Sequence, residues 1–168
     1  NLTSLDVSQN LSLATLYCDF NQLTSLDVSG NTALTALYCQ ANQLTSLELG
    51  NIDLEELYCR ENNLTTLDIA NNISLDQLDC SYNQITNLDV IQCDQILVLN
   101  CSHNQLTSLD FNNNLDIYSL NCSDNQLTSL DISYSTSLES LNFSNNHLTS
   151  IDLSSFDPFF FNLFAQGN

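Results

Sequence analysis

The sequence predicts a repeat solenoid that is mostly β, with little or no helix. A leucine-centred motif recurs along all 168 residues, and repeats with periods of 20–50 residues indicate stacked coils. Apolar residues alternate over only a few positions at a time, without the longer periodicity of an amphipathic helix. With 3 glycines and 1 proline, the chain is too poor in turn formers for a set of β-hairpins. We therefore expect a coil whose successive turns pair in parallel.

The repeat unit is 21 residues long, as between Leu2 and Leu23, except for a unit of 20 between Leu44 and Leu64. Eight such units cover the chain as a single solenoid domain: 1–21, 22–42, 43–62, 63–83, 84–104, 105–125, 126–146 and 147–168. Solenoids need caps over their exposed cores, and no residues are left over for one. We expect the chain to be part of a longer protein, or its ends to stack on other copies.

Within a unit the pattern is L-x-x-L-x-C-x-x-N-x-L-x-x-L-D-V-x-x-N-x-x, as in the stretch from Leu34 to Leu49. Its first half resembles the leucine-rich repeat signature, with cysteine in place of a core leucine. The second half repeats the same spacing as L-x-x-L-x-V-x-x-N, so each unit contains two shorter repeats. The whole chain resembles bacterial cell-surface leucine-rich repeats: the 21-residue repeats of Bacteroidetes surface proteins and the internalin J type of listerial repeat, with its column of cysteines. The resemblance implies a right-handed coil on a secreted or surface-exposed protein.

Alternation places two short strands on opposite sides of each coil. In "LYC", Leu37 and Cys39 point inward and Tyr38 points outward; in "LEL", Leu47 and Leu49 point inward. A turn between the two sides carries the same residue in the first seven units: Asn21, Asn42, Asn62, Asn83, Asn104, Asn125 and Asn146. Because an amide both donates and accepts, we expect these side chains to satisfy the backbone groups of a buried turn.

One inward position forms a cysteine column: Cys18, Cys39, Cys59, Cys80, Cys101 and Cys122. Side chains in register on parallel strands point the same way, whereas a disulfide needs them turned toward each other. A straight column also offers no point at which four zinc ligands converge. We interpret the thiols as small buried hydrophobes. Cys93 stands apart, in the position that we assign to Asn10, Asn31, Asn51 and Asn114 in other units, and we expect it too to be a buried thiol.

One outward position is acidic in every unit: Asp6, Asp27, Glu48, Asp68, Asp89, Asp110, Asp131 and Asp152. Like charges stacked this closely repel one another, so something must offset the repulsion. Hydrogen bonds from nearby hydroxyl or backbone N–H groups, or exposure to salt water, could do so. Bridging calcium ions are the alternative, because they favour carboxylate oxygens. We expect no cofactor or structural metal, and calcium at this column is the weaker hypothesis.

Positions that vary between units are free for function, and they predict a ligand-binding face. Its residues are Tyr17, Phe20, Tyr38, Glu55, Tyr58, Asp79 and Tyr82. Exposed tyrosines are favoured binding anchors, since they bury a large area at a small entropic cost. The alternative is that they only stack along the sheet and stabilise it.

The charge balance limits the partners. One Lys or Arg against 20 Asp and Glu gives a formal net charge of −19, which excludes nucleic acid and disfavours an anionic membrane surface. No apolar run is long enough to insert into a bilayer. No hydrolase, metalloprotease or phosphate-loop motif occurs, so we expect no enzyme.

Two functions stay open. The first is a protein- or glycan-binding module, for adhesion or interaction, of a secreted or surface-exposed bacterial protein. The second is a stalk or filament segment that stacks end to end on further copies or domains, with the aromatic stretch "FDPFFFNLF" from Phe156 to Phe164 at a junction or terminal cap.

Overall fold

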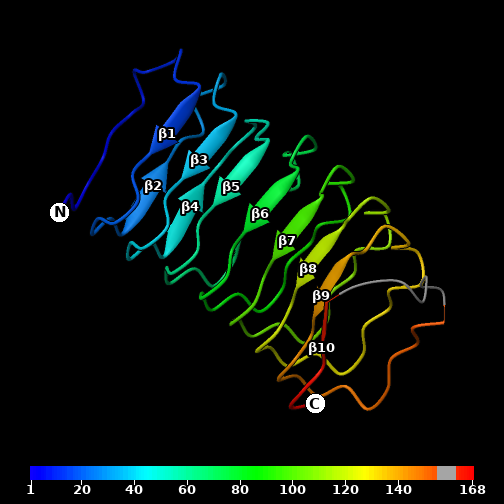
Figure 1. Cartoon of the computed structure of the whole chain (residues 1–168). Coiled ribbons are helices and arrows are strands. Elements are labelled where there is room, and N and C mark those ends of the chain that lie inside the picture. The colour runs from blue at the N-terminus through cyan, green and yellow to red at the C-terminus, as the bar shows by residue number, and fades with distance from the viewer. Residues whose placement is uncertain (155–161) are drawn as a thin grey trace.

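The computed structural model describes residues 1–154 and 162–168. It is a parallel β-solenoid of about seven turns, and the described residues contain no helix. Strands of three residues lie side by side along the coil (Figure 1). The main sheet consists of β1 Thr15–Tyr17, β3 Ala36–Tyr38, β5 Glu56–Tyr58, β6 Gln77–Asp79, β7 Val98–Asn100, β8 Ser119–Asn121, β9 Ser140–Asn142 and β10 Asn162–Phe164.

All neighbouring strands of the main sheet pair in parallel, with leucine opposite leucine at the centre of each strand. Leu37, Leu57 and Leu78 are typical, and each is at most 1% exposed. Full burial of such a side chain contributes about 1.5–3 kcal/mol. The main sheet therefore contributes one column of leucines to the core, built coil by coil from the inward positions that the alternation predicts.

A second sheet lies on the other side of the coil, but among the described residues it has only two strands. These are β2 Ser25–Asp27 and β4 Ser46–Glu48. Leu26 in β2 is buried, while Leu47 in β4 is half-buried. The predicted strands on two sides are thus present, but the second side pairs only in the early coils. An alternating pattern fixes which side chains point inward, not whether two backbones come within hydrogen-bonding distance.

The asparagine turn forms a continuous hydrogen-bonded ladder. Asn104 is representative: its Nδ2 donates to the carbonyls of Cys80 (3.0 Å) and Cys101 (3.2 Å), and its Oδ1 accepts the backbone N–H of Ile85 (2.9 Å). Each amide therefore ties its own coil to the preceding one. Asn168 makes the corresponding bonds for the last coil, to Phe143, Ala165 and Leu148. Residues 156–161 of the predicted junction segment lie outside the described residues.

The residue before each asparagine from Asn21 to Asn146 has a left-handed backbone, although none of these residues is glycine; only Asn168 follows a glycine, Gly167. The column has φ between 52° and 54° and consists of Phe20, Ala41, Glu61, Tyr82, His103, Asp124 and Asn145. Its backbone N–H groups bond across coils, as from Tyr82 to the carbonyl of Ser102 (3.0 Å). The hydrogen bonds between coils thus hold the backbone in a conformation that is unfavourable for any residue with a Cβ.

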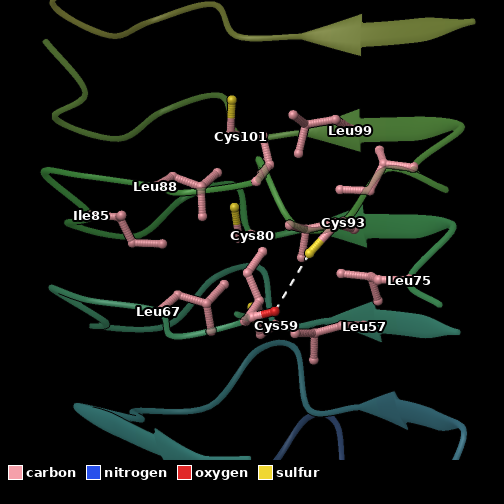
Figure 2. Close-up of a cluster of buried hydrophobic side chains, with 14 of the residues drawn as sticks. Leu57, Cys59, Leu67, Leu75, Cys80, Ile85, Leu88, Cys93, Leu99 and Cys101 are labelled. Atoms are coloured by element: carbon pink, nitrogen blue, oxygen red, sulfur yellow. Dashed lines mark hydrogen bonds between the residues drawn. The ribbon is translucent and has the colours of Figure 1, made fainter. Parts of the chain in front are cut away.

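Cys93 lies on the opposite edge of the core from the cysteine column, and its thiol donates to the carbonyl of Ile69 (3.5 Å) (Figure 2). The same position holds Asn31, Asn72 and Asn114, which donate to carbonyls of the preceding coil. In the 20-residue unit the sequence assignment is wrong: Ile52 is buried there, and Asn51 is exposed. Ile52 follows Asn31 by the regular 21 residues and precedes Asn72 by 20, so the residue that this unit lacks is missing after Ile52.

Candidate binding face

The outward positions of the main sheet from β1 to β9 form one row in register, which we call the outer row. It consists of Tyr17, Tyr38, Tyr58, Asp79, Asn100, Asn121 and Asn142. Neighbouring strands lie about 4.8 Å apart, so the side chains follow one another at that interval. The row changes from aromatic to short and polar between Tyr58 and Asp79, on the adjacent strands β5 and β6 (Figure 1).

The three tyrosines stack on one another along the coil. The ring centroids of Tyr17 and Tyr38 are 4.4 Å apart with 7° between the ring planes, and those of Tyr38 and Tyr58 are 5.1 Å apart with 12° between them. The Tyr38 hydroxyl donates to Glu56, and the Tyr58 hydroxyl donates to Gln77 (2.6 Å). The bond to Glu56 and partial burial raise the pKa of Tyr38. Each ring is therefore held in place before any ligand arrives.

The other predicted face residues surround this row without joining it. Glu55 is exposed and immediately precedes β5. Phe20 and Tyr82 occupy the left-handed turn position beyond β1 and β6, where they are 71% and 52% exposed. Ala41 and Glu61 stand between them in that column. The structure brings Tyr17, Tyr38 and Tyr58 together and separates Phe20 from Tyr82.

The polar half of the outer row is held by a set of buried serines. Each serine donates its hydroxyl and its backbone N–H to the side-chain oxygen of the outer-row residue two positions earlier. The pairs are Asp79 with Ser81, Asn100 with Ser102, Asn121 with Ser123 and Asn142 with Ser144. The pattern [D/N]-x-S signals this arrangement in the sequence, and comparing outward positions one at a time misses it.

A depression of about 250 Å³ lies where the two halves meet. Tyr58, Asp79, Asn100 and Asn121 line it, together with parts of β6, β7 and β8. The short side chains that follow Tyr58 leave this space open, since a fourth tyrosine at position 79 would fill it.

A second side-chain row follows the left-handed turns of the later coils. The rings of Tyr82 and His103 stack with centroids 4.0 Å apart. His103 Nε2 lies 3.4 Å from Asp124 Oδ2, and Asn145 donates to Asp124 Oδ1 (2.9 Å). The single arginine, Arg60, pairs with Glu61 (2.8 Å) in the same column. These exposed contacts contribute little to stability.

Comparison with known proteins identifies the coil. The Leucine Rich Repeat family model matches residues 137–159. The functional domain of InlJ from Listeria monocytogenes, which includes a cysteine ladder, is 35% identical with a TM-score of 0.77 over 99% of this chain. The chain folds as a leucine-rich repeat solenoid. No curated protein matches its sequence.

Other leucine-rich repeat structures agree. A leucine-rich repeat protein of Leptospira interrogans is 26% identical, with a TM-score of 0.75 over 91% of this chain. The ectodomain of the Arabidopsis thaliana receptor kinase GASSHO1/SCHENGEN3 is 23% identical, with a TM-score of 0.75 over 96% of this chain and 23% of its own length. The present chain spans about half of the first two structures, 47% of InlJ and 46% of the Leptospira protein.

The seven cysteines of this leucine-rich repeat solenoid are all free and buried. Burial is the main cause that raises the pKa of every one of them, to about 11 for Cys18 and about 12 for Cys122. The thiols of Cys59, Cys80 and Cys101 lie one above another in the core (Figure 2). Thiolates are the nucleophiles and metal ligands, so buried, protonated thiols are poorly suited to either task.

Seven of the eight acidic positions on the other side of the solenoid accept a hydrogen bond. The carboxylates of Asp6, Asp27, Asp68, Asp89, Asp110, Asp131 and Asp152 each accept the backbone N–H two residues later, at 2.8–3.1 Å. Bonds from the following serine lower the pKa of Asp6, Asp27, Asp131 and Asp152. Within residues 1–154 and 162–168, no group of three or more His, Cys, Asp or Glu could hold a metal ion.

Proposed function

We propose that this solenoid is a non-catalytic interaction module, for adhesion to a protein or glycan, of a secreted or surface-exposed bacterial protein. The outer row carries the proposal. Its aromatic half is pre-ordered by stacking and by hydroxyl bonds, and Tyr17 remains 68% exposed. Large aromatic side chains that lose little conformational entropy on binding are typical anchors of binding interfaces.

The comparisons support this proposal at the level of the fold. Leucine-rich repeat proteins typically serve as protein-interaction modules and are generally not enzymes. The GASSHO1/SCHENGEN3 ectodomain is in a complex with Casparian strip integrity factor 2. InlJ and receptor ectodomains also favour an extracellular or surface location for this chain. Among the described residues, no helix has the length and hydropathy needed to cross a bilayer.

Catalysis has little support from the side chains. Among the described residues, no serine hydroxyl or cysteine thiol forms a hydrogen bond with the imidazole ring of His103 or His147, so no nucleophile is paired with a base. The only ion pair that involves a histidine there is the contact between His103 and Asp124.

Replacing the tyrosine stack tests the binding function. A Tyr17→Ser, Tyr38→Ser, Tyr58→Ser variant should lose binding to immobilised arrays of extracellular proteins and glycans, measured by biolayer interferometry. The matched control replaces three exposed apolar residues outside the main sheet, Ile73, Leu115 and Tyr134, by serine, and it should bind like the parent. Equal binding by the two folded triple variants would contradict a role for the outer row.

The regularity of the coil favours a second function, a stalk or filament segment. The asparagine ladder and the main sheet continue without a break between successive coils through β9. Such a segment should associate end to end with further copies, so its sedimentation coefficient should rise with protein concentration. A constant monomer coefficient from micromolar to millimolar protein would argue against self-association.

A further inference from the structure

The tyrosine stack ends with one ring face open. The ring of Tyr58 is nearly parallel to that of Tyr38, which covers one of its faces. The next residue in the row is Asp79, whose side chain is too short to continue the stack, and Tyr58 lines the depression on that side. The hydroxyl bond to Gln77 Oε1 keeps the ring upright. The depression therefore has an aromatic wall, fixed in place and uncovered.

The remaining lining offers hydrogen-bonding groups in fixed positions. Ser102 and Ser123, which are 2% and 4% exposed, hold the Oδ1 atoms of Asn100 and Asn121. The Nδ2 groups of these two asparagines are left without a partner among the described residues, and each has two N–H donors. Ser81 holds Asp79 in the same way through Oδ1, which leaves Oδ2 as an acceptor. Two kinds of hydrogen-bonding group thus lie beside one apolar ring face.

We propose that this depression binds a neutral oligosaccharide: one sugar ring stacks on the open face of Tyr58, and the hydroxyl groups bond to Asp79, Asn100 and Asn121. This inference rests on the proposed binding function and names the ligand class of its site. A pyranose ring has an apolar face for the aromatic wall and hydroxyls that both donate and accept, which matches a site with an apolar wall and a few placed polar groups. Asn142 extends the row by one strand spacing, so a linear oligosaccharide can lie across the strands.

The surrounding charge selects against acidic sugars. Burial and the neighbouring carboxylates of Glu56, Asp79 and Asp76 raise the pKa of the Tyr58 hydroxyl. The guanidinium of Arg60 is paired with Glu61. A uronic acid or a sulfated sugar would enter a negative field without a counter-charge.

Isothermal titration calorimetry tests the proposal with cellohexaose, xylohexaose, mannohexaose and chitohexaose as neutral probes and hexagalacturonate as the acidic one. We expect at least one neutral probe to bind and hexagalacturonate not to bind. Tyr58→Ala and Asn121→Ala should each weaken binding about tenfold, as for a central anchor residue. Tyr58→Phe keeps the ring face and should retain most of the affinity. Tyr134→Ala, which removes an exposed ring outside the main sheet, is the matched control and should bind like the parent.

Circular dichroism melts confirm that each variant is folded. Binding of none of the four neutral probes, or binding unaffected by both Tyr58→Ala and Asn121→Ala, overturns the proposal. The proposal is also overturned if a lysine- and arginine-rich peptide binds at Tyr58 and no sugar binds there. If the parent binds a protein ligand that the triple tyrosine variant loses, and no sugar binds, the proposed interaction function stands and the oligosaccharide proposal is rejected. If the parent binds no protein and no glycan, both proposals are rejected.

Discussion

At the residue scale, the turn after each strand of the main sheet imposes a left-handed backbone on whatever residue stands there. The position holds Phe20, Glu61 and His103 as well as Asn145, all with φ near 53°. A residue with a Cβ loses about 1–2 kcal/mol in this conformation. The position therefore limits stability while tolerating many side chains, which suits a site that varies from coil to coil.

Ala41→Gly should stabilise the solenoid. Glycine removes the steric penalty at φ 53° and loses part of the gain to its larger backbone entropy, which leaves up to about 1 kcal/mol. Urea unfolding measures the change. The control is Ala36→Gly within β3, where the backbone is extended, and it should destabilise by about 0.5–1 kcal/mol. If the two variants changed stability in the same direction, the left-handed strain would be negligible.

Cys80→Ser should destabilise the solenoid by about 1–3 kcal/mol, because it places a hydroxyl without a prepared partner in a fully buried position. Cys80→Ala strands no polar group and should cost less. Chemical denaturation of both variants gives the comparison. A serine variant as stable as the parent would mean that the cysteine column is not the dry interior described above.

At the element scale, the asparagine ladder explains how a coil with so little regular strand holds together. Asn104→Ala should cost at least about 2 kcal/mol, because it leaves the buried N–H of Ile85 without a partner and removes one of the two amide bonds that the carbonyls of Cys80 and Cys101 each accept. Gln105→Ala, at the exposed neighbouring position, should change stability by less than about 0.5 kcal/mol. Comparable losses in the two variants would contradict the role of the ladder.

Calcium removal tests the acidic column. The aspartates already accept backbone N–H bonds, as Asp110 does from Asn112 (3.1 Å), and these bonds favour the charged carboxylate. We therefore expect the melting temperature to be the same in EDTA and in millimolar calcium chloride, with magnesium chloride as the control for ionic strength. A rise in calcium alone would show that the column binds that ion specifically.

The sequence predicts positions that repeat far better than positions that vary. Leu37, Cys39 and Asn42 lie where alternation and spacing place them, because a fixed cross-section demands the same residue type in every coil. The open face of Tyr58 and its bond to Gln77 join different coils, and no pattern within one unit contains them. Asn51 was misassigned for a different reason: the assignment followed residue type, whereas Ile52 keeps the regular spacing of 21 residues from Asn31 and is the buried one.

At the scale of the whole molecule, the formal charge of −19 opposes the compact state through self-repulsion. Sodium chloride should therefore raise the melting temperature as the screening length falls from about 30 Å at 0.01 M to about 8 Å at 0.15 M. Tetramethylammonium chloride at equal ionic strength should do the same, because screening does not depend on the cation. An effect limited to one cation would point to site binding.

Every junction between coils uses the same atoms, and this has a consequence for how such a chain can evolve. The amide of one coil closes the turn of the one before it, so a whole unit can be duplicated or lost by recombination and the flanking coils still fit. The outer row is not interchangeable in this way. Copying the unit that carries Tyr38 would lengthen the aromatic stack, and copying the one that carries Asn121 would lengthen the amide row. The extent of the ligand-contacting surface could thus be changed by the number of copied units, because each added coil packs on its neighbours through the existing contacts.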